Sequence, residues 1–82
     1  MINSLTKAER ARQQMTLQQF GDALGVSRQA VHQWESGDNI PDYGRLLVIV
    51  ETCGDWRKRW AQACISAHPY MEEYQETLKG QE

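Results

Sequence analysis

The sequence predicts an all-α fold of five or six short helices, and three observations lead to this fold class. Helix start and end signals follow one another along the chain. The alternating β-branched runs and Asn-Gly or Asp-Gly turns that typify hairpins are absent. The chain has 82 residues, which is enough for one small domain. We therefore expect a single compact helical domain.

Two capping boxes delimit the first two helices. Thr6 and Glu9 have the spacing of a capping box, which predicts a first helix over about residues 7–14. A second box begins at Thr16, where Gln follows at the third position. The helix that it opens is expected to end before Gly25, a residue that readily adopts the left-handed conformation of a helix end.

Single caps delimit the next two helices. A serine at position 27 can cap a third helix that runs to about Ser36 and ends at Gly37. The following Asp-Asn-Ile-Pro segment is typical of a turn. Asp42 can then cap a fourth helix over about residues 43–53, which Gly54 would end.

The C-terminal part adds one or two more helices. Asp55 can cap a fifth helix over about residues 56–67. Pro69 interrupts the pattern, because proline lacks an amide donor and disfavours a helical residue before it. A last helix is expected over about residues 70–79, with acidic residues in its first turn.

The composition excludes several classes of protein. No apolar run approaches the roughly 20 residues that cross a bilayer, and no signal peptide opens the sequence. We therefore expect a cytoplasmic protein without membrane contact. In that setting Cys53 and Cys64 are expected to be reduced thiols in the core.

Nothing in the sequence indicates catalysis. A Gly-rich phosphate loop is absent, no pair of carboxylates has supporting neighbours, and the Cys and His residues lack the short paired spacings of zinc sites. We therefore expect neither an enzyme nor a metal site or other cofactor.

The charge is weakly negative overall but unevenly distributed. The net charge is −2, whereas residues 1–37 carry four basic and three acidic side chains. The acidic excess lies in residues 38–54 and 55–82. Any surface that binds an anion must therefore be local, made by a few residues on one face.

The second and third helices are separated by so short a turn that they must cross steeply and share a contact face. Gly21 would allow close approach there, and Val26 can fill the corner. The apolar and small residues expected to form the core of this unit are Phe20, Gly21, Leu24, Gly25, Val26, Val31 and Trp34. The opposite side of the third helix is polar throughout, as a helix that reads a DNA groove requires.

Residues 15–54 resemble the helix-turn-helix domain of the lambda-repressor/Cro-like family. The Leu-Gly-Val-Ser corner, the Trp-Glu-x-Gly helix end, the proline that follows and the apolar helix closing in Cys-Gly all fall in register. The resemblance implies a five-helix DNA-binding domain, usually a transcriptional regulator and often a dimer on a palindromic operator. It also implies an ion pair between Arg10 and Glu35.

Within such a domain the polar row of the third helix would read base edges. Arg can bind guanine bidentately and Gln can bind adenine. The candidate base-reading residues are Arg28, Gln29, His32 and Gln33. The alternative is an ordinary solvated helix face, and for His32 the role of a bystander is equally open.

Residues near helix N-termini are candidates for phosphate contact, because free amides and the positive end of the helix dipole favour anions. These residues are Thr16, Gln18, Ser27 and Ser36. The alternative for Thr16 and Ser27 is a purely structural role as caps, which is compatible with phosphate contact.

The chain therefore divides into a DNA-binding core over residues 1–54, with the helix-turn-helix at about 16–36, and a helical extension over residues 55–82 of the same compact domain. An apolar stripe along the extension suggests a dimer or partner interface, since aromatic residues and Met are enriched at interfaces. The interface candidates are Trp60, Tyr70, Met71 and Tyr74. Trp56, nearest the fourth helix, is expected to close the monomer core, and the same alternative exists for Trp60.

The function expected from these features is sequence-specific binding of a double-stranded DNA operator by a homodimer. A small Cro-type repressor of a bacteriophage or prophage fits this description. The alternative is an antitoxin that binds a partner protein through its C-terminal helices and also binds its own promoter.

Overall fold

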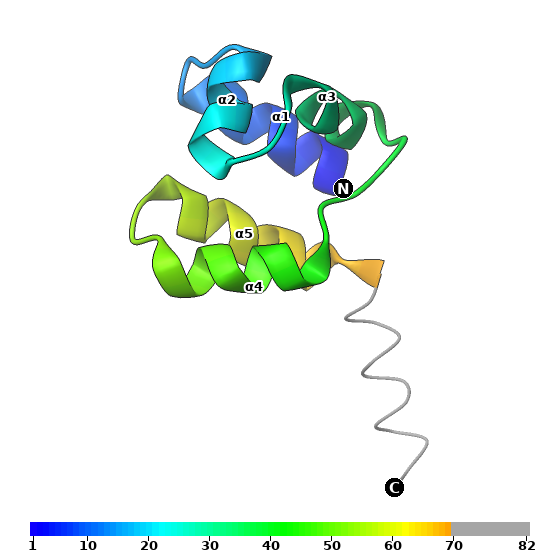
Figure 1. Ribbon diagram of the computed structural model, residues 1–82. Coiled ribbons are helices and arrows are strands. Elements are labelled where there is room, and N and C mark those ends of the chain that lie inside the picture. Colours follow the sequence, from blue (N-terminus) through cyan, green and yellow to red (C-terminus); the bar gives the residue numbers. More distant parts are fainter. Residues whose placement is uncertain (70–82) are drawn as a thin grey trace, which may run out of the picture.

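The computed structural model describes residues 1–69. These residues form five helices and no strand, which confirms the all-α prediction. The helices are α1 (Ile2–Arg12), α2 (Leu17–Leu24), α3 (Arg28–Ser36), α4 (Tyr43–Thr52) and α5 (Trp56–Ala67). Figure 1 shows α1, α2 and α3 grouped together, with α4 and α5 side by side beneath them. The sixth helix expected over residues 70–79 lies outside the described residues.

The N-caps of four helices are those that the sequence predicts. The side chains of Thr16, Ser27, Asp42 and Asp55 each accept a hydrogen bond from a backbone amide in the first turn of α2, α3, α4 and α5. For α2 the full capping box is present. The ends of α2 and α3 also follow prediction, because the glycines after them have left-handed φ angles of 74° and 86°.

The predicted start of the first helix is wrong. Helix α1 begins at Ile2, and Thr6 lies inside it as a buried residue rather than as a cap. The Thr6 hydroxyl donates to the Ile2 carbonyl (2.8 Å) and accepts from the indole nitrogen of Trp60 (3.3 Å). Glu9 points to α5 and accepts a hydrogen bond from Arg59 (2.9 Å). The Thr-x-x-Glu pattern here serves contacts with α5 and not helix initiation.

Two helix ends also differ from expectation. Helix α1 ends at Arg12, two residues before the predicted end. Helix α4 ends at Thr52, because Cys53 already has an extended conformation (φ −108°, ψ 143°). Both differences are within the usual uncertainty of a helix end, where the last turn frays.

The core is centred on the indole ring of Trp60, which is only 2% exposed. This ring meets Phe20 edge to face (centroids 5.6 Å apart) and stacks on Trp34 (5.8 Å). Trp60 therefore belongs to the monomer core, and its prediction as an interface residue is wrong. Trp56, which was expected to close the core, is only partly buried and packs against Phe20 (5.2 Å).

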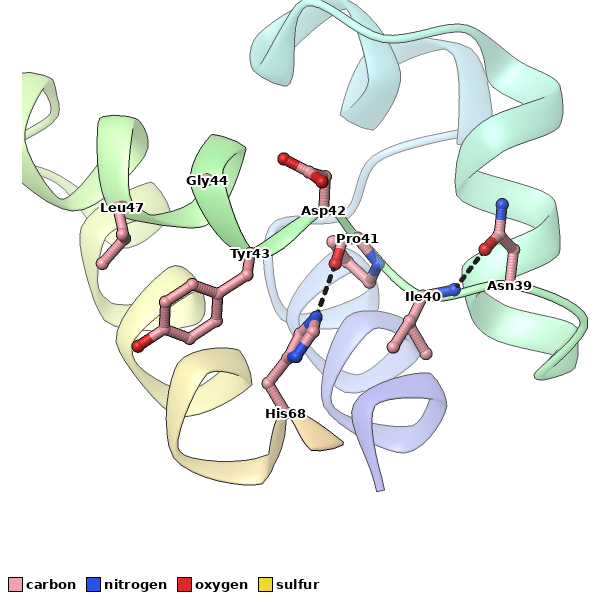
Figure 2. Close-up of a pocket in the computed structure, with 8 residues that line it drawn as sticks. All are labelled: Asn39, Ile40, Pro41, Asp42, Tyr43, Gly44, Leu47 and His68. Carbon is pink, nitrogen blue, oxygen red and sulfur yellow. Dashed lines mark hydrogen bonds between the residues drawn. The ribbon is translucent and has the colours of Figure 1, made fainter. Parts of the chain in front are cut away.

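Polar contacts tie α5 to the other helices. The guanidinium of Arg57 donates to the carbonyl of Ala23 near the end of α2 (3.1 Å), and Arg59 pairs with Glu9 of α1. After α5, a ring nitrogen of His68 lies 3.0 Å from the carbonyl oxygen of Pro41 (Figure 2). These contacts fix the extension against the first four helices.

The buried Cys64 and the lengths of the helices bear on what the composition predicts. Cys64 is fully buried, and burial raises the pKa of its thiol to about 12, so the thiol stays protonated at neutral pH. Within residues 1–69, none of the helices has the length and apolar character needed to cross a membrane.

The buried carboxylate of Glu9 makes the fold sensitive to acid. Burial alone would raise its pKa, but hydrogen bonds from Gln13 and Arg59, together with the charges of Arg59 and Arg12, outweigh burial and lower the pKa below 4.5. A lowered pKa in the folded state means that ionised Glu9 stabilises the fold above its unfolded pKa. This contribution is lost as the pH falls through the folded value.

We predict that Glu9→Gln lowers the free energy of unfolding by about 1–3 kcal/mol at neutral pH, since charged hydrogen bonds are lost. The difference from the parent should shrink in acid, as the pH falls through the lowered pKa at which Glu9 becomes protonated in the parent as well. Urea unfolding at neutral and at acidic pH measures this difference. The exposed Glu51→Gln serves as the control and should change little at either pH. A Glu9→Gln effect of equal size at both pH values would contradict the assignment.

Candidate nucleic-acid interface

The turn between α2 and α3 is held by a close backbone contact. A Cβ atom on Gly21 would lie 2.7 Å from the carbonyl oxygen of Val26 and 3.2 Å from that of Ser27. In addition, the amide of Val26 donates to the carbonyl of Gly21 (2.9 Å). The close approach expected at Gly21 is thus made to the turn itself and not to the body of α3.

The apolar side of this unit packs inward. The side chains of Phe20, Leu24, Val31 and Trp34 are all buried, and Val26 is partly buried against them. Gly25 adopts the left-handed conformation that lets the chain leave α2 and reach the cap of α3 within two residues. With Val31 and Trp34 facing the core, the other side of α3 faces solvent.

The outward side of α3 carries the four candidate base-reading residues. Arg28, Gln29 and His32 are exposed and Gln33 is partly exposed. No hydrogen bond or ion pair within residues 1–69 involves the side chain of Arg28, Gln29 or His32. Their donors and acceptors are therefore directed to solvent and available to a ligand.

The candidate phosphate-contacting residues differ in their surroundings. The hydroxyls of Thr16 and Ser27 accept cap hydrogen bonds, which leaves each hydroxyl hydrogen able to donate to an anion. The side-chain amide of Gln18 donates a hydrogen bond to the carboxylate of Asp22 (2.9 Å). The hydroxyl of Ser36 lies 3.0 Å from a carboxylate oxygen of Asp38, a neighbour that disfavours a phosphate.

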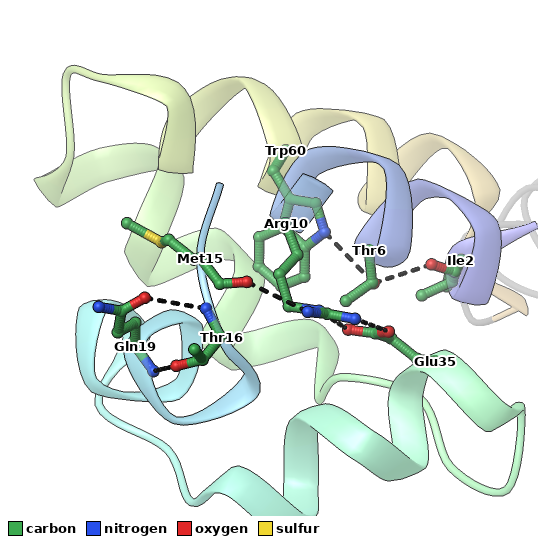
Figure 3. Close-up of polar contacts among 8 residues, drawn as sticks. All are labelled: Ile2, Thr6, Arg10, Met15, Thr16, Gln19, Glu35 and Trp60. Carbon is green, nitrogen blue, oxygen red and sulfur yellow. Dashed lines mark hydrogen bonds and ion pairs between the residues drawn. The ribbon is translucent and has the colours of Figure 1, made fainter. Parts of the chain in front are cut away.

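A bidentate ion pair fixes α3 against α1. Arg10 donates through Nε to Oε2 of Glu35 (2.6 Å) and through Nη2 to Oε1 (3.0 Å), as Figure 3 shows. Its Nη1 atom donates to the carbonyl of Met15 (3.1 Å), directly before the cap of α2. The hydrogen bonds to Glu35 raise the pKa of Arg10 above its ordinary value. One guanidinium thus holds α1, the start of α2 and α3 in fixed relation.

The other surfaces of the described residues have fewer groups that could bind a ligand. A hollow of about 750 Å³ lies between the α3–α4 loop, the start of α4 and His68 (Figure 2). Its lining includes Ile40, Tyr43 and Leu47. In the part of the chain that the structure describes, no three His, Cys, Asp or Glu side chains come together to hold a metal ion.

Two hydrogen bonds that hold the ends of α2 could not be predicted from the sequence. The carbonyl of Met15 receives Arg10, and the carbonyl of Ala23 receives Arg57. Backbone carbonyls carry no sequence signature, and Arg57 lies 34 residues from its acceptor. No local pattern could have paired them.

A comparison with known families identifies the domain. The helix-turn-helix family model HTH_3 matches residues 7–54, which is more than half of the chain. The chain belongs to the lambda-repressor/Cro-like helix-turn-helix family. No curated protein and no solved structure matches the chain.

Membership in this family assigns the general function. The protein is a DNA-binding transcriptional regulator of the helix-turn-helix type. The matched residues span the second half of α1 and all of α2, α3 and α4, and so include the corner and the polar row of α3. Helix α5 follows the matched segment and supplies Trp60 to its core.

The contact at Gly21 leads to a prediction about the corner. We expect Gly21→Ala to destabilise the protein by about 1–3 kcal/mol, because the added methyl group meets a backbone carbonyl that cannot move aside alone. Thermal unfolding measures the effect. Gly54→Ala is the matched control, since a Cβ there meets nothing within 4 Å. Equal melting temperatures for Gly21→Ala and the parent would refute the close contact.

Proposed function

We propose that the protein is a small Cro-type regulator that binds a specific double-stranded DNA operator with α3 in the major groove. The observation that carries this proposal is the two-sided character of α3. Its inner side is buried on the aromatic core, whereas the side chains of Arg28, Gln29 and His32 are exposed and make no hydrogen bond or ion pair within residues 1–69. A helix with its polar row free and its position fixed is suited to base reading.

The available groups support contacts with both bases and backbone. Arg28 can bind the O6 and N7 atoms of guanine, and Gln29 or Gln33 can bind N6 and N7 of adenine. The hydroxyls of Thr16 and Ser27, with the unpaired amides of the first turns, suit phosphates on either side of the groove. Occupation of an operator in this way would repress transcription by blocking polymerase in the cytoplasm of a bacterial or phage-infected cell.

We further propose that the protein acts as a homodimer on a palindromic operator. One recognition helix reads too few base pairs to discriminate among the sites of a genome. Apolar surface suited to a second copy lies on α4 and the loop before it, where Ile40, Leu47 and Val48 are 38%, 43% and 57% exposed. The interface candidates Tyr70, Met71 and Tyr74 remain part of this proposal and lie outside the described residues.

The antitoxin alternative receives less support from the described residues. It needs an apolar stripe on the extension that a partner protein can reach. Trp60 and Cys64 of that stripe are buried in the monomer core. The stripe continues after Pro69, beyond the described residues.

The base-reading proposal predicts the behaviour of two glutamines. After selection of preferred sites from random duplexes, Gln29→Ala and Gln33→Ala should each weaken binding to the best site by about 1–3 kcal/mol and relax preference at one base position. Gln62→Ala on the exposed side of α5 is the control and should bind as the parent does. Circular dichroism should be unchanged in all three variants. Undiminished binding by both α3 variants would show that another surface reads the operator.

The dimer proposal predicts the behaviour of the α4 surface. The double substitution Leu47→Glu and Val48→Glu should convert the dimer to a monomer, because it places charges in an apolar contact. Sedimentation equilibrium of the full chain measures this change, and Gln62→Glu on α5 is the control. A monomeric parent, or a double variant that remains dimeric, would exclude this surface. Purification of the parent in a stable complex with a different protein would favour the antitoxin.

A further inference from the structure

A second hollow lies beside the polar row of α3, and the Arg10–Glu35 pair forms part of its wall. Its volume is about 290 Å³, and it opens between α1, the start of α2 and the second half of α3. The residues that line it are Lys7, Arg10, Leu17, His32, Glu35 and Ser36.

Among the charged side chains that line this hollow, Lys7 is the one without an ion-pair partner within residues 1–69. Arg10 and Glu35 neutralise each other in their bidentate pair, and their side chains are only 25% and 10% exposed. Lys7, in contrast, is exposed and takes part in none of the ion pairs within residues 1–69. The hydroxyl of Ser36 is already hydrogen-bonded to the carboxylate of Asp38, so the cation of Lys7 and not Ser36 would attract a ligand here. An unpaired ammonium group beside a neutral pair favours an anionic ligand.

The position of the hollow identifies the class of anion. His32 and Ser36 belong to the outward side of α3, one and two turns beyond Arg28, so the hollow continues the candidate interface. Leu17 is the first residue of α2, where backbone amides are unpaired. In helix-turn-helix complexes the second helix lies in the major groove and the first crosses the sugar-phosphate backbone. A hollow beside the start of α2 would therefore face a phosphodiester of the bound DNA.

We propose that this hollow is a DNA-backbone subsite in which Lys7 of α1 neutralises one phosphate of the operator, next to the imidazole of His32. This inference rests on the proposed function and extends the footprint from α2 and α3 to α1. A lysine contacts phosphate as a point charge on a flexible stem and carries no base preference. Lys7 would therefore add affinity without adding sequence discrimination.

The test compares Lys7→Gln with Lys58→Gln, which removes an exposed lysine from α5. Binding of the full chain to the selected operator and to a scrambled duplex is measured by fluorescence anisotropy over a series of salt concentrations. Lys7→Gln should weaken binding to both duplexes about five- to tenfold near 0.1 M salt and reduce the slope of log K against log salt by about 0.9 per subunit. The ratio between the two duplexes should stay unchanged, and Lys58→Gln should keep the parent slope.

A second measurement locates the contact. Operators carrying one uncharged methylphosphonate at successive positions should reveal a phosphate whose neutralisation weakens the parent but does not weaken Lys7→Gln further. A parent-like slope for Lys7→Gln, or an equal loss for Lys58→Gln, would overturn the subsite while leaving specific binding intact. If the parent instead shows no preference for any sequence, the proposed function fails, and the slope of Lys7→Gln still decides whether Lys7 meets DNA.

Discussion

The carbonyl oxygen of Val26 occupies the space where a side chain at residue 21 would stand, and the arrangement of α2 and α3 depends on this contact. Because residue 21 is glycine, α2 can close directly on the turn that follows it. The chain then reaches the cap of α3 within two residues of the left-handed Gly25. This short connection determines the direction in which α3 leaves the turn, and hence which of its sides faces solvent.

The remaining contacts hold α3 at that angle from its inner side. Val31 and Trp34 pack into the core, and Trp34 stacks on Trp60 of α5. The pair between Arg10 and Glu35 joins α3 to α1 through two charge-assisted hydrogen bonds, a geometry that adds orientation as well as energy. The extension thus supports α3 from its inner side, because its buried tryptophan packs on Trp34.

Sequence reasoning succeeded where the determining interactions are local. The caps of α2, α3, α4 and α5 act over two or three residues, and the glycine helix ends act within one turn, so each leaves a short pattern. The predicted start of α1 was wrong because the Thr6 hydroxyl does not cap a helix. It accepts a hydrogen bond from Trp60, which lies 54 residues away in the sequence. The burial of Trp60 could not be predicted for the same reason. The helical spacing of the apolar residues on α5 is equally compatible with a core and with an interface. The outward row of α3 was predictable because its periodicity is complementary to that of two buried residues.

The outward row of α3 and the residues beside it form the proposed DNA-binding surface. This surface can be mapped by titrating isotope-labelled protein with the selected operator and following the amide chemical shifts. We expect the largest shift changes from Ser27 to Ser36 and at the start of α2, with small changes along the buried side of α5. Largest changes on α4 and α5, with α3 unaffected, would contradict this proposal.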